Sequence, residues 1–125
     1  MVPLTDEHRS YWSTLMVFHH TVIDKLRPGI TGKALFDECT RLYAKAGLDF
    51  PYAHNGHGLG LQVHERPMIS PHEDMAFEAG MVCTVETRVR WPNVKGYHIE
   101  DLFLIQDGAP LLLSDAFDNR EILVL

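Results

Sequence analysis

The chain has 125 residues, of which 46% are apolar, 22% charged and 10% aromatic, and its formal net charge is −6 with histidine counted as neutral. This length and composition are typical of a globular protein with a hydrophobic core, so we expect residues 1–125 to form a single domain rather than a disordered or fibrous chain. The acidic balance, the lack of a basic run and the lack of a long apolar stretch argue against nucleic acid and membranes as partners, and a cytoplasmic location is the default prediction.

Two helices are predicted at the N-terminal end. The first begins at Thr5, a suitable N-cap, and extends to the basic residues before the Pro28-Gly29 stop. The second begins at residue 31 or 32, continues to about residue 46 and is stopped by Gly47. Apolar residues recur at helical spacing in both segments, which predicts that one face of each helix is buried.

Three later segments, residues 81–89, 97–105 and 111–113, predict antiparallel strands. They are rich in β-branched or apolar residues and are separated by turn-forming residues. Helices followed by such strands predict an α+β fold, with the two N-terminal helices packed on one face of an antiparallel sheet. Cys39 and Cys83 lie in apolar-periodic segments and are predicted to be free, buried thiols.

Glycine and histidine are dense between the helices and the strands. Residues 56–60 read Gly-His-Gly-Leu-Gly, and we interpret these glycines as leaving the His57 imidazole accessible to a ligand or metal. If residues 61–64 are extended, His64 projects from a strand whose other face is apolar. The alternative is a glycine-rich surface turn that carries two solvated histidines.

A carboxylate, Glu86, lies inside the first predicted strand. Period-two alternation places it on one face with Thr84 and Arg88. Because burying an unpaired carboxylate is costly, its charge requires compensation. A metal ion is one compensator, and an ion pair with Arg88 or Arg90 is the other.

A second carboxylate, Glu100, lies in the next predicted strand. His98 and Glu100 point to one face of that strand, whereas Asp101 points to the other. Together with His57 and Glu86, the residues form a mixed nitrogen and oxygen ligand set. Such a set suits Mn, Fe, Co or Zn better than it suits Ca, which prefers oxygen alone.

Four motifs in register carry a family resemblance: Gly-His-Gly-Leu-Gly at 56–60, Val-His-Glu-Arg-Pro at 63–67, Ala-Gly-Met-Val-Cys-Thr-Val-Glu at 79–86 and Gly-Tyr-His-Ile-Glu-Asp at 96–101. Their order resembles the C-terminal, metal-binding half of the pita-bread metallopeptidases, the creatinase, aminopeptidase P, prolidase and methionine aminopeptidase type. The resemblance covers nearly the whole chain. It implies the C-terminal half of a pita-bread catalytic domain.

The resemblance also implies roles for individual residues. His57 would ligate one metal, Glu86 would ligate a metal and help to deprotonate water, and Glu100 would bridge two divalent ions, which could be Mn, Co, Fe or Zn. His64 would be a catalytic histidine that is not a ligand and that hydrogen-bonds the scissile carbonyl. The implied activity resembles that of aminopeptidase P or Xaa-Pro dipeptidase, in which water activated by two metals attacks the N-terminal peptide bond of a peptide or small amide substrate.

Several positions depart from the family pattern. The family's first two ligands are aspartates on a ribbon before the first helix, and this chain starts too late to contain them. None of Asp6, Asp24, Asp37 and Asp101 is in a suitable context to replace them. Losing two anionic ligands should weaken metal binding.

Other departures lie close to the predicted ligands. Thr87 stands where proline is usual, and we expect it to alter only local strand geometry. His98 stands where arginine is frequent. It could be an extra ligand or a proton carrier, although a hydrogen-bonded partner of the ligands is the favoured interpretation. His54 and Asn55 lie in a loop that we expect to be solvated, from which His54 could also support the ligands.

Three hypotheses follow for function. The chain is part of a metal-dependent hydrolase, or it is a non-catalytic remnant of the fold that serves binding or assembly. In the third, the absent ribbon comes from pairing with a missing N-terminal segment or from a second copy in a homodimer. Whether the chain alone is an enzyme stays open, and we expect it to load metal poorly.

Overall fold

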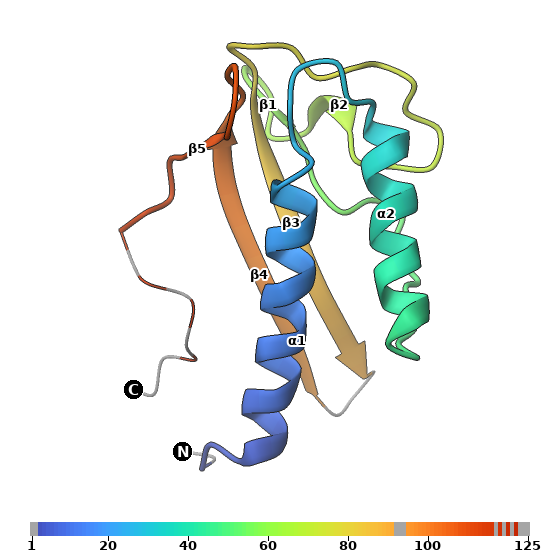
Figure 1. Cartoon of the computed structure of the whole chain (residues 1–125), viewed down its shortest axis with the longest axis vertical. Helices are drawn as coiled ribbons and strands as arrows, with labels where there is room; N and C mark the ends of the chain where they lie inside the picture. The colour runs from blue at the N-terminus through green and yellow to red at the C-terminus, as the bar shows by residue number, and fades with distance from the viewer. Residues whose placement is uncertain (1–2, 92–94, 117, 119, 121, 123–125) are drawn as a thin grey trace.

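A computed structural model describes residues 3–91, 95–116, 118, 120 and 122 of the chain. Two helices precede a five-stranded antiparallel sheet with the strand order β2-β1-β3-β4-β5. The elements are α1 (Asp6–Ile23), α2 (Gly32–Lys45), β1 (His57–Leu59), β2 (Glu65–Met68), β3 (Val82–Trp91), β4 (Lys95–Leu104) and β5 (Leu111–Leu112). Both helices lie against the sheet on the same side (Figure 1). The predicted α+β arrangement is confirmed.

Local capping explains where both helices begin. The Thr5 hydroxyl accepts a hydrogen bond from the His8 N–H at 3.3 Å, and His8 Nδ1 accepts one from the Thr5 N–H at 3.1 Å. At the second helix, the Thr31 hydroxyl accepts from the Ala34 N–H at 3.1 Å. These bonds satisfy backbone donors that the first helical turn leaves without intrahelical partners. The first helix ends at Ile23, earlier than the predicted stop at Pro28-Gly29.

A ten-residue ladder between β3 and β4 forms the centre of the sheet. It runs from the pair Val82↔Leu104 to the pair Trp91↔Lys95, and it sets Glu86 directly opposite Glu100. Because successive side chains alternate between the faces of a strand, Cys83, Val85, Thr87 and Val89 form one buried row. Glu86 belongs to the opposite row. The register therefore places the two carboxylates on the sheet face turned away from the helices.

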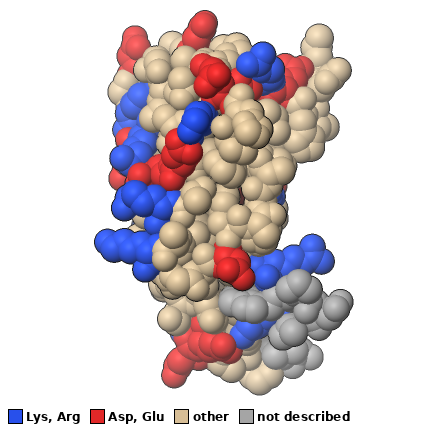
Figure 2. All heavy atoms as spheres, turned by 90° about the vertical axis from the view of Figure 1, so that its right-hand side faces the viewer, with Lys and Arg blue, Asp and Glu red and all other residues tan. Residues whose placement is uncertain are grey.

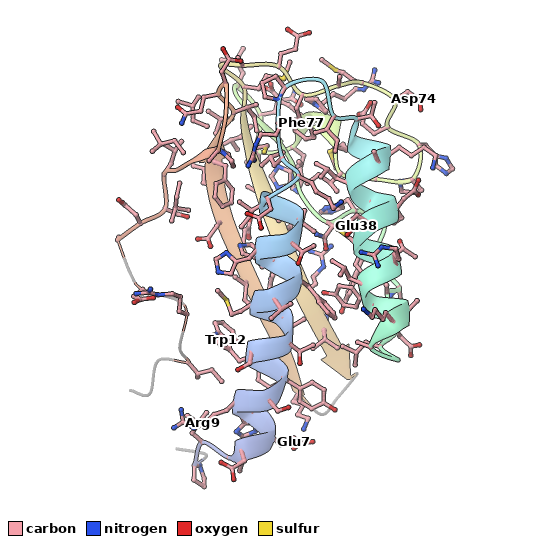
Figure 3. All side chains as sticks on the ribbon, viewed as in Figure 1. Glu7, Arg9, Trp12, Glu38, Asp74 and Phe77 are labelled. Atoms are coloured by element: carbon pink, nitrogen blue, oxygen red, sulfur yellow. The ribbon has the colours of Figure 1, made fainter. Side chains whose placement is uncertain are left out.

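The core fills the space between the helices and the sheet. One cluster joins Val22, Leu26, Leu35, Cys39, Ile69, Phe77, Cys83, Val85, Phe103 and Ile105, and a second joins Leu15, Met16, Phe18, Tyr43, Val89 and Ile99. Phe77 is labelled in Figure 3, near the loop between α1 and α2. Both cysteines are free and buried as predicted, and burial raises the pKa of each thiol to about 12.

Residues 61–64 do not form the extended segment from which His64 would project. These residues form a bend between β1 and β2. Leu61 is 104% exposed and Val63 is 68% exposed, so the apolar alternation does not mark a buried strand face. The alternative of two solvated histidines is wrong for His57, which is 4% exposed, whereas His64 is exposed.

The glycines around His57 have a different role from the predicted one. A Cβ on Gly56, whose φ is +146°, would lie 2.2 Å from the Thr84 carbonyl oxygen. A Cβ on Gly58 would lie 2.8 Å from the Arg66 carbonyl oxygen. These positions are therefore small because neighbouring backbone approaches closely. This close packing of backbone explains the glycines at 56 and 58 without any requirement for ligand access to His57.

A buried polar network connects α1 to β3 and β4. His19, which is 0% exposed, lies with Nδ1 2.9 Å from the Thr87 hydroxyl and Nε2 3.1 Å from the Asp101 carboxylate. The Ser114 hydroxyl donates to the other Asp101 oxygen at 2.7 Å. The expectation that Thr87 alters only strand geometry is therefore wrong, because its hydroxyl is the partner of a buried imidazole. Asp101 faces away from Glu100, as predicted.

Glu73 holds the loop after β2 in place. Its carboxylate, on a residue that is 4% exposed, accepts two bonds from Arg66 at 2.6 and 3.0 Å. It also accepts from the backbone N–H groups of Met68 at 3.1 Å and Met75 at 3.0 Å. The hydrogen bond from Arg66 is the main cause that lowers the pKa of Glu73 from 4.5 to about 2.

Replacing Glu73 with glutamine is expected to lower the free energy of unfolding at pH 7 by about 2 kcal/mol. Because the folded-state pKa is depressed, the carboxylate stabilises the fold above about pH 4.5 and loses this effect as the pH falls towards about 2. Urea unfolding at pH 7 and pH 3 should therefore show a smaller difference between wild type and variant at the lower pH. The exposed Glu78→Gln is the control, and an equal loss at both pH values would contradict the assignment.

The outer side of α2 carries charges of both signs. Lys33 contacts Asp37 at 2.5 Å, and Arg41 contacts Glu38 at 2.6 Å. Figure 2 shows acidic and basic side chains interspersed on this face. Pairs of this kind near the surface contribute little to stability. Within the described residues, neither helix combines the length and the apolar character that crossing a membrane requires.

Candidate metal centre

The three predicted ligands come together in the folded chain. His57, Glu86 and Glu100 each offer one nitrogen or oxygen atom, and these atoms all lie within 4.8 Å of one another. We call these residues the candidate cluster. They come from three adjacent strands: β1 pairs with β3 next to His57, and β3 pairs Glu86 with Glu100. Among the described residues, no other group of three or more His, Cys, Asp or Glu side chains brings its ligand atoms this close together.

The His57 ring is oriented by its own backbone. Nδ1 lies 3.0 Å from the Gly58 carbonyl oxygen, which can only accept, so Nδ1 carries the hydrogen in the neutral ring. The lone pair is then on Nε2, which lies 3.7 Å from Glu86 Oε1. Fixing one ring nitrogen with a carbonyl is how ligand histidines are held in metal sites. This donor set fits a divalent transition metal.

Glu86 is buried, with 5% of the residue exposed, and several groups compensate its charge. Its carboxylate oxygens lie 3.3 Å from His54 Nδ1 and 3.3 Å from His98 Nε2, and Arg88 Nη1 makes a close ion pair with Oε2. Burial is the largest influence and raises the pKa of Glu86. The contact from His98 and the charges of Arg88 and His54 outweigh it, so the pKa of Glu86 lies below its ordinary value. Glu86 is therefore an anion at neutral pH.

Arg88 forms an ion pair with Glu86, which was the predicted alternative to charge compensation by a metal. Its second guanidinium nitrogen donates to the His54 carbonyl oxygen at 2.9 Å, and the guanidinium carbon lies 4.6 Å from the centre of the Tyr52 ring. The Tyr43 hydroxyl donates to the Arg88 carbonyl at 2.7 Å and accepts from the Arg88 N–H at 3.0 Å. Arg90, the other arginine considered, is exposed. The guanidinium is thus fixed beside Glu86.

Glu100 and His98 form the open side of the cluster. Their side chains are 46% and 47% exposed, and His98 Nε2 lies 4.0 Å from Glu100 Oε2. The two residues share a face of β4, as period-two alternation predicts. His98 bridges the space between the buried carboxylate of Glu86 and the exposed carboxylate of Glu100.

His54 and His64 lie close to the His57 ring. The centroid of the His64 ring is 4.1 Å from that of His57, and the centroid of the His54 ring is 6.0 Å from it. Burial is the main cause that lowers the pKa of His54. The expectation of a solvated loop is wrong, because Asn55 is 1% exposed and its carbonyl accepts from the Glu86 N–H at 2.8 Å.

An open hollow lies over the candidate cluster. Besides the three cluster residues, its lining includes His64 and the apolar side chains of Leu59 and Val63. Polar groups that converge beside apolar lining are typical of sites that bind small molecules. The hollow can therefore hold both the polar and the apolar parts of a small substrate.

Comparison with known proteins identifies the family. Residues 1–107 match the model of metallopeptidase family M24. A Xaa-Pro dipeptidase from Pyrococcus furiosus is 29% identical over 119 residues, which are 94% of this chain and 34% of that protein. A solved structure of prolidase from Pyrococcus furiosus superimposes with a TM-score of 0.85 at 26% identity, covering 93% of this chain and 35% of the other.

One solved structure with a different name shows the same fold. The N-terminal domain of the FACT complex subunit SPT16 from Cicer arietinum has a TM-score of 0.77 at 17% identity, over 93% of this chain and 30% of that one. At this identity the likeness shows the fold alone. The chain spans about one third of the length of the Pyrococcus furiosus dipeptidase. The family match and the shared architecture place the chain in metallopeptidase family M24, as part of its pita-bread fold.

Proposed function

We propose that the chain supplies the metal-binding part of a hydrolase that cleaves N-terminal peptide bonds, of the aminopeptidase P or Xaa-Pro dipeptidase type. The observation that carries this proposal is the convergence of one imidazole and two carboxylates within 4.8 Å. The names of the relatives support the same reaction class. Peptides with proline at the second position are the proposed substrates.

The candidate cluster would hold a divalent ion, with Mn, Co, Fe and Zn all suited to the donor set. When bound, such an ion would lower the pKa of a water molecule and polarise the substrate carbonyl. Glu86, already an anion, would accept a proton from that water. His64, exposed beside His57, would donate a hydrogen bond to the scissile carbonyl. The apolar side chains of the hollow would contact the proline ring.

The two-ion centre that the resemblance implies needs more anionic groups than the candidate cluster provides. Two further carboxylates would have to come from a pairing segment or from a second copy of the chain. Without them, the candidate cluster would hold one ion. Hydrolysis would then depend on the complete polypeptide or assembly in which the chain occurs.

In that complete form, Mn²⁺ or Co²⁺ is expected to support release of the N-terminal residue from a Xaa-Pro peptide. Glu100→Ala is expected to lower kcat/KM by about 100-fold or more, because it removes a ligand that would position the ion. The matched control is Glu78→Ala, an exposed carboxylate away from the site. Wild-type kinetics in a folded Glu100→Ala variant would contradict the proposal.

The second candidate is a non-catalytic role in binding or assembly. The ion pair between Arg88 and Glu86 favours it, because the guanidinium compensates the buried carboxylate without a metal. The two candidates differ in metal content and turnover. Stoichiometric metal loading accompanied by peptide hydrolysis would eliminate the non-catalytic role.

A further inference from the structure

Glu86 presents its two oxygens to two different sets of partners. Oε1 faces His54 at 3.3 Å and His57 at 3.7 Å. Oε2 faces His98 at 3.3 Å and is the oxygen that Arg88 contacts. A cation on the His57 side would therefore meet a carboxylate oxygen that imidazole nitrogens face but that the guanidinium does not contact. A second cation, on the other side, would meet a position that a guanidinium already fills.

Arg88 is held too firmly to move aside without losing several contacts. The guanidinium bonds to Glu86 and to the His54 carbonyl, and it lies over the Tyr52 ring. Its side chain is 20% exposed. The Tyr43 hydroxyl fixes both backbone polar groups of the same residue. Since a cation over an aromatic face is stabilised there, the positive charge stays beside the carboxylate.

The charge balance sets a limit on how many ions can bind. Glu86 and Glu100 carry two negative charges, the neutral His57 ring carries none, and Arg88 contributes one positive charge. One divalent ion therefore leaves a small excess of positive charge, and a second would leave a large one. Repulsion of this kind is weakly screened where groups are partly buried.

We propose that Arg88 is a built-in cation that takes the place of a second metal beside Glu86, so that the candidate cluster holds one divalent ion. This inference rests on the proposed function, because it takes the three cluster residues as metal ligands. Arg88 then occupies the side of Glu86 that a second ion would need, in addition to the limit that the small number of carboxylates sets. It also weakens the affinity for the one ion that binds.

Isothermal titration calorimetry of the full 125-residue chain with Mn²⁺ and Co²⁺ tests the proposal. Wild type is expected to bind one ion per chain. Arg88→Met keeps an apolar stem over Tyr52 and removes the charge, and it is expected to bind that ion about 10-fold more tightly or more. Two ions bound by wild type, or an unchanged affinity in Arg88→Met, would overturn the role of Arg88.

Two further variants make the test independent of folding defects. Arg88→Gln keeps an amide donor for the His54 carbonyl while removing the charge, and the same gain in affinity is expected from it. Arg90→Met removes an equal charge from an exposed position on β3 and should stay within about 2-fold of wild type. Equal gains from Arg88→Met and Arg90→Met would show a general charge effect and would overturn the proposal.

The failure of the proposed function would look different. If His57→Ala binds metal as tightly as wild type, the candidate cluster is not the metal site, and the role of Arg88 is overturned with it. If His57→Ala loses the ion while both Arg88 variants bind no more tightly than wild type, the metal site stands and only the role of Arg88 is overturned.

Discussion

Replacing His57 with alanine is expected to lower the affinity of the chain for Mn²⁺ or Co²⁺ by about 100-fold or more. The ring is the nitrogen donor of the candidate cluster, and its Nε2 faces Glu86 because Nδ1 is held by the Gly58 carbonyl. Without the ring, two carboxylates remain, of which Glu86 is also paired with Arg88. Isothermal titration calorimetry measures the loss directly.

The matched control for this prediction is His72→Ala. His72 is exposed in the segment between β2 and β3, so its removal should leave the affinity within about 2-fold of wild type. Circular dichroism melting of both variants separates a lost ligand from a lost fold. A folded His57→Ala variant with wild-type affinity would show that the geometry of the cluster does not serve metal binding.

A second large effect is expected from Gly32→Ala, at the first position of α2. Helix propensity alone predicts a gain of about 1 kcal/mol, because alanine is the better helix former. The structure predicts the opposite sign. A Cβ at this position would lie 1.8 Å from the Met68 carbonyl oxygen and 2.6 Å from Glu73 Cγ. Because backbone has to move, we expect a loss of about 3 kcal/mol and a fall in Tm of about 10 °C.

Gly47→Ala provides the comparison for this variant. Its φ is +67° and its Cβ would meet nothing within 4 Å, so it tests the cost of a left-handed backbone without a steric overlap. That cost is about 1 kcal/mol. Thermal unfolding of the two variants should therefore rank Gly32→Ala well below Gly47→Ala. A Gly32→Ala variant as stable as wild type would show that α2 can shift away from β2 freely.

Much of the fold could be predicted from sequence because its signals are local. Threonine caps at positions 5 and 31 set where the helices begin, and runs of apolar residues with turn signals set β3, β4 and β5 to within two residues. At residues 61–64 the local pattern does not determine the structure. Leu61 and Val63 alternate with polar residues as in a strand, but both are exposed, and Val63 lines the hollow rather than a core.

The parts of the site that depend on the alternation of side chains along a single strand could be predicted from the sequence. Glu86 and Glu100 could be placed on faces by alternation, and motif order linked them to His57. The contacts between distant segments could not be predicted in this way. The imidazole of His19 and the hydroxyl of Thr87 are separated by 68 positions in the chain, and neither residue type by itself indicates a buried network. The sequence leaves Arg88 and Arg90 as alternative ion-pair partners of Glu86, and only the folded arrangement distinguishes them.

The hydroxyl of Tyr43 also affects whether a strand of another molecule can pair with β3. β1 pairs with β3 at Val82 and Cys83, so farther along β3 no strand among the described residues covers that side. There the Asn55 carbonyl accepts a hydrogen bond from the Glu86 N–H. The Tyr43 hydroxyl donates to the Arg88 carbonyl and accepts from the Arg88 N–H. An uncovered strand edge is a template for strands of neighbouring molecules. These contacts occupy the Glu86 N–H and both backbone groups of Arg88, so a strand of a second chain could not pair with β3 at these residues.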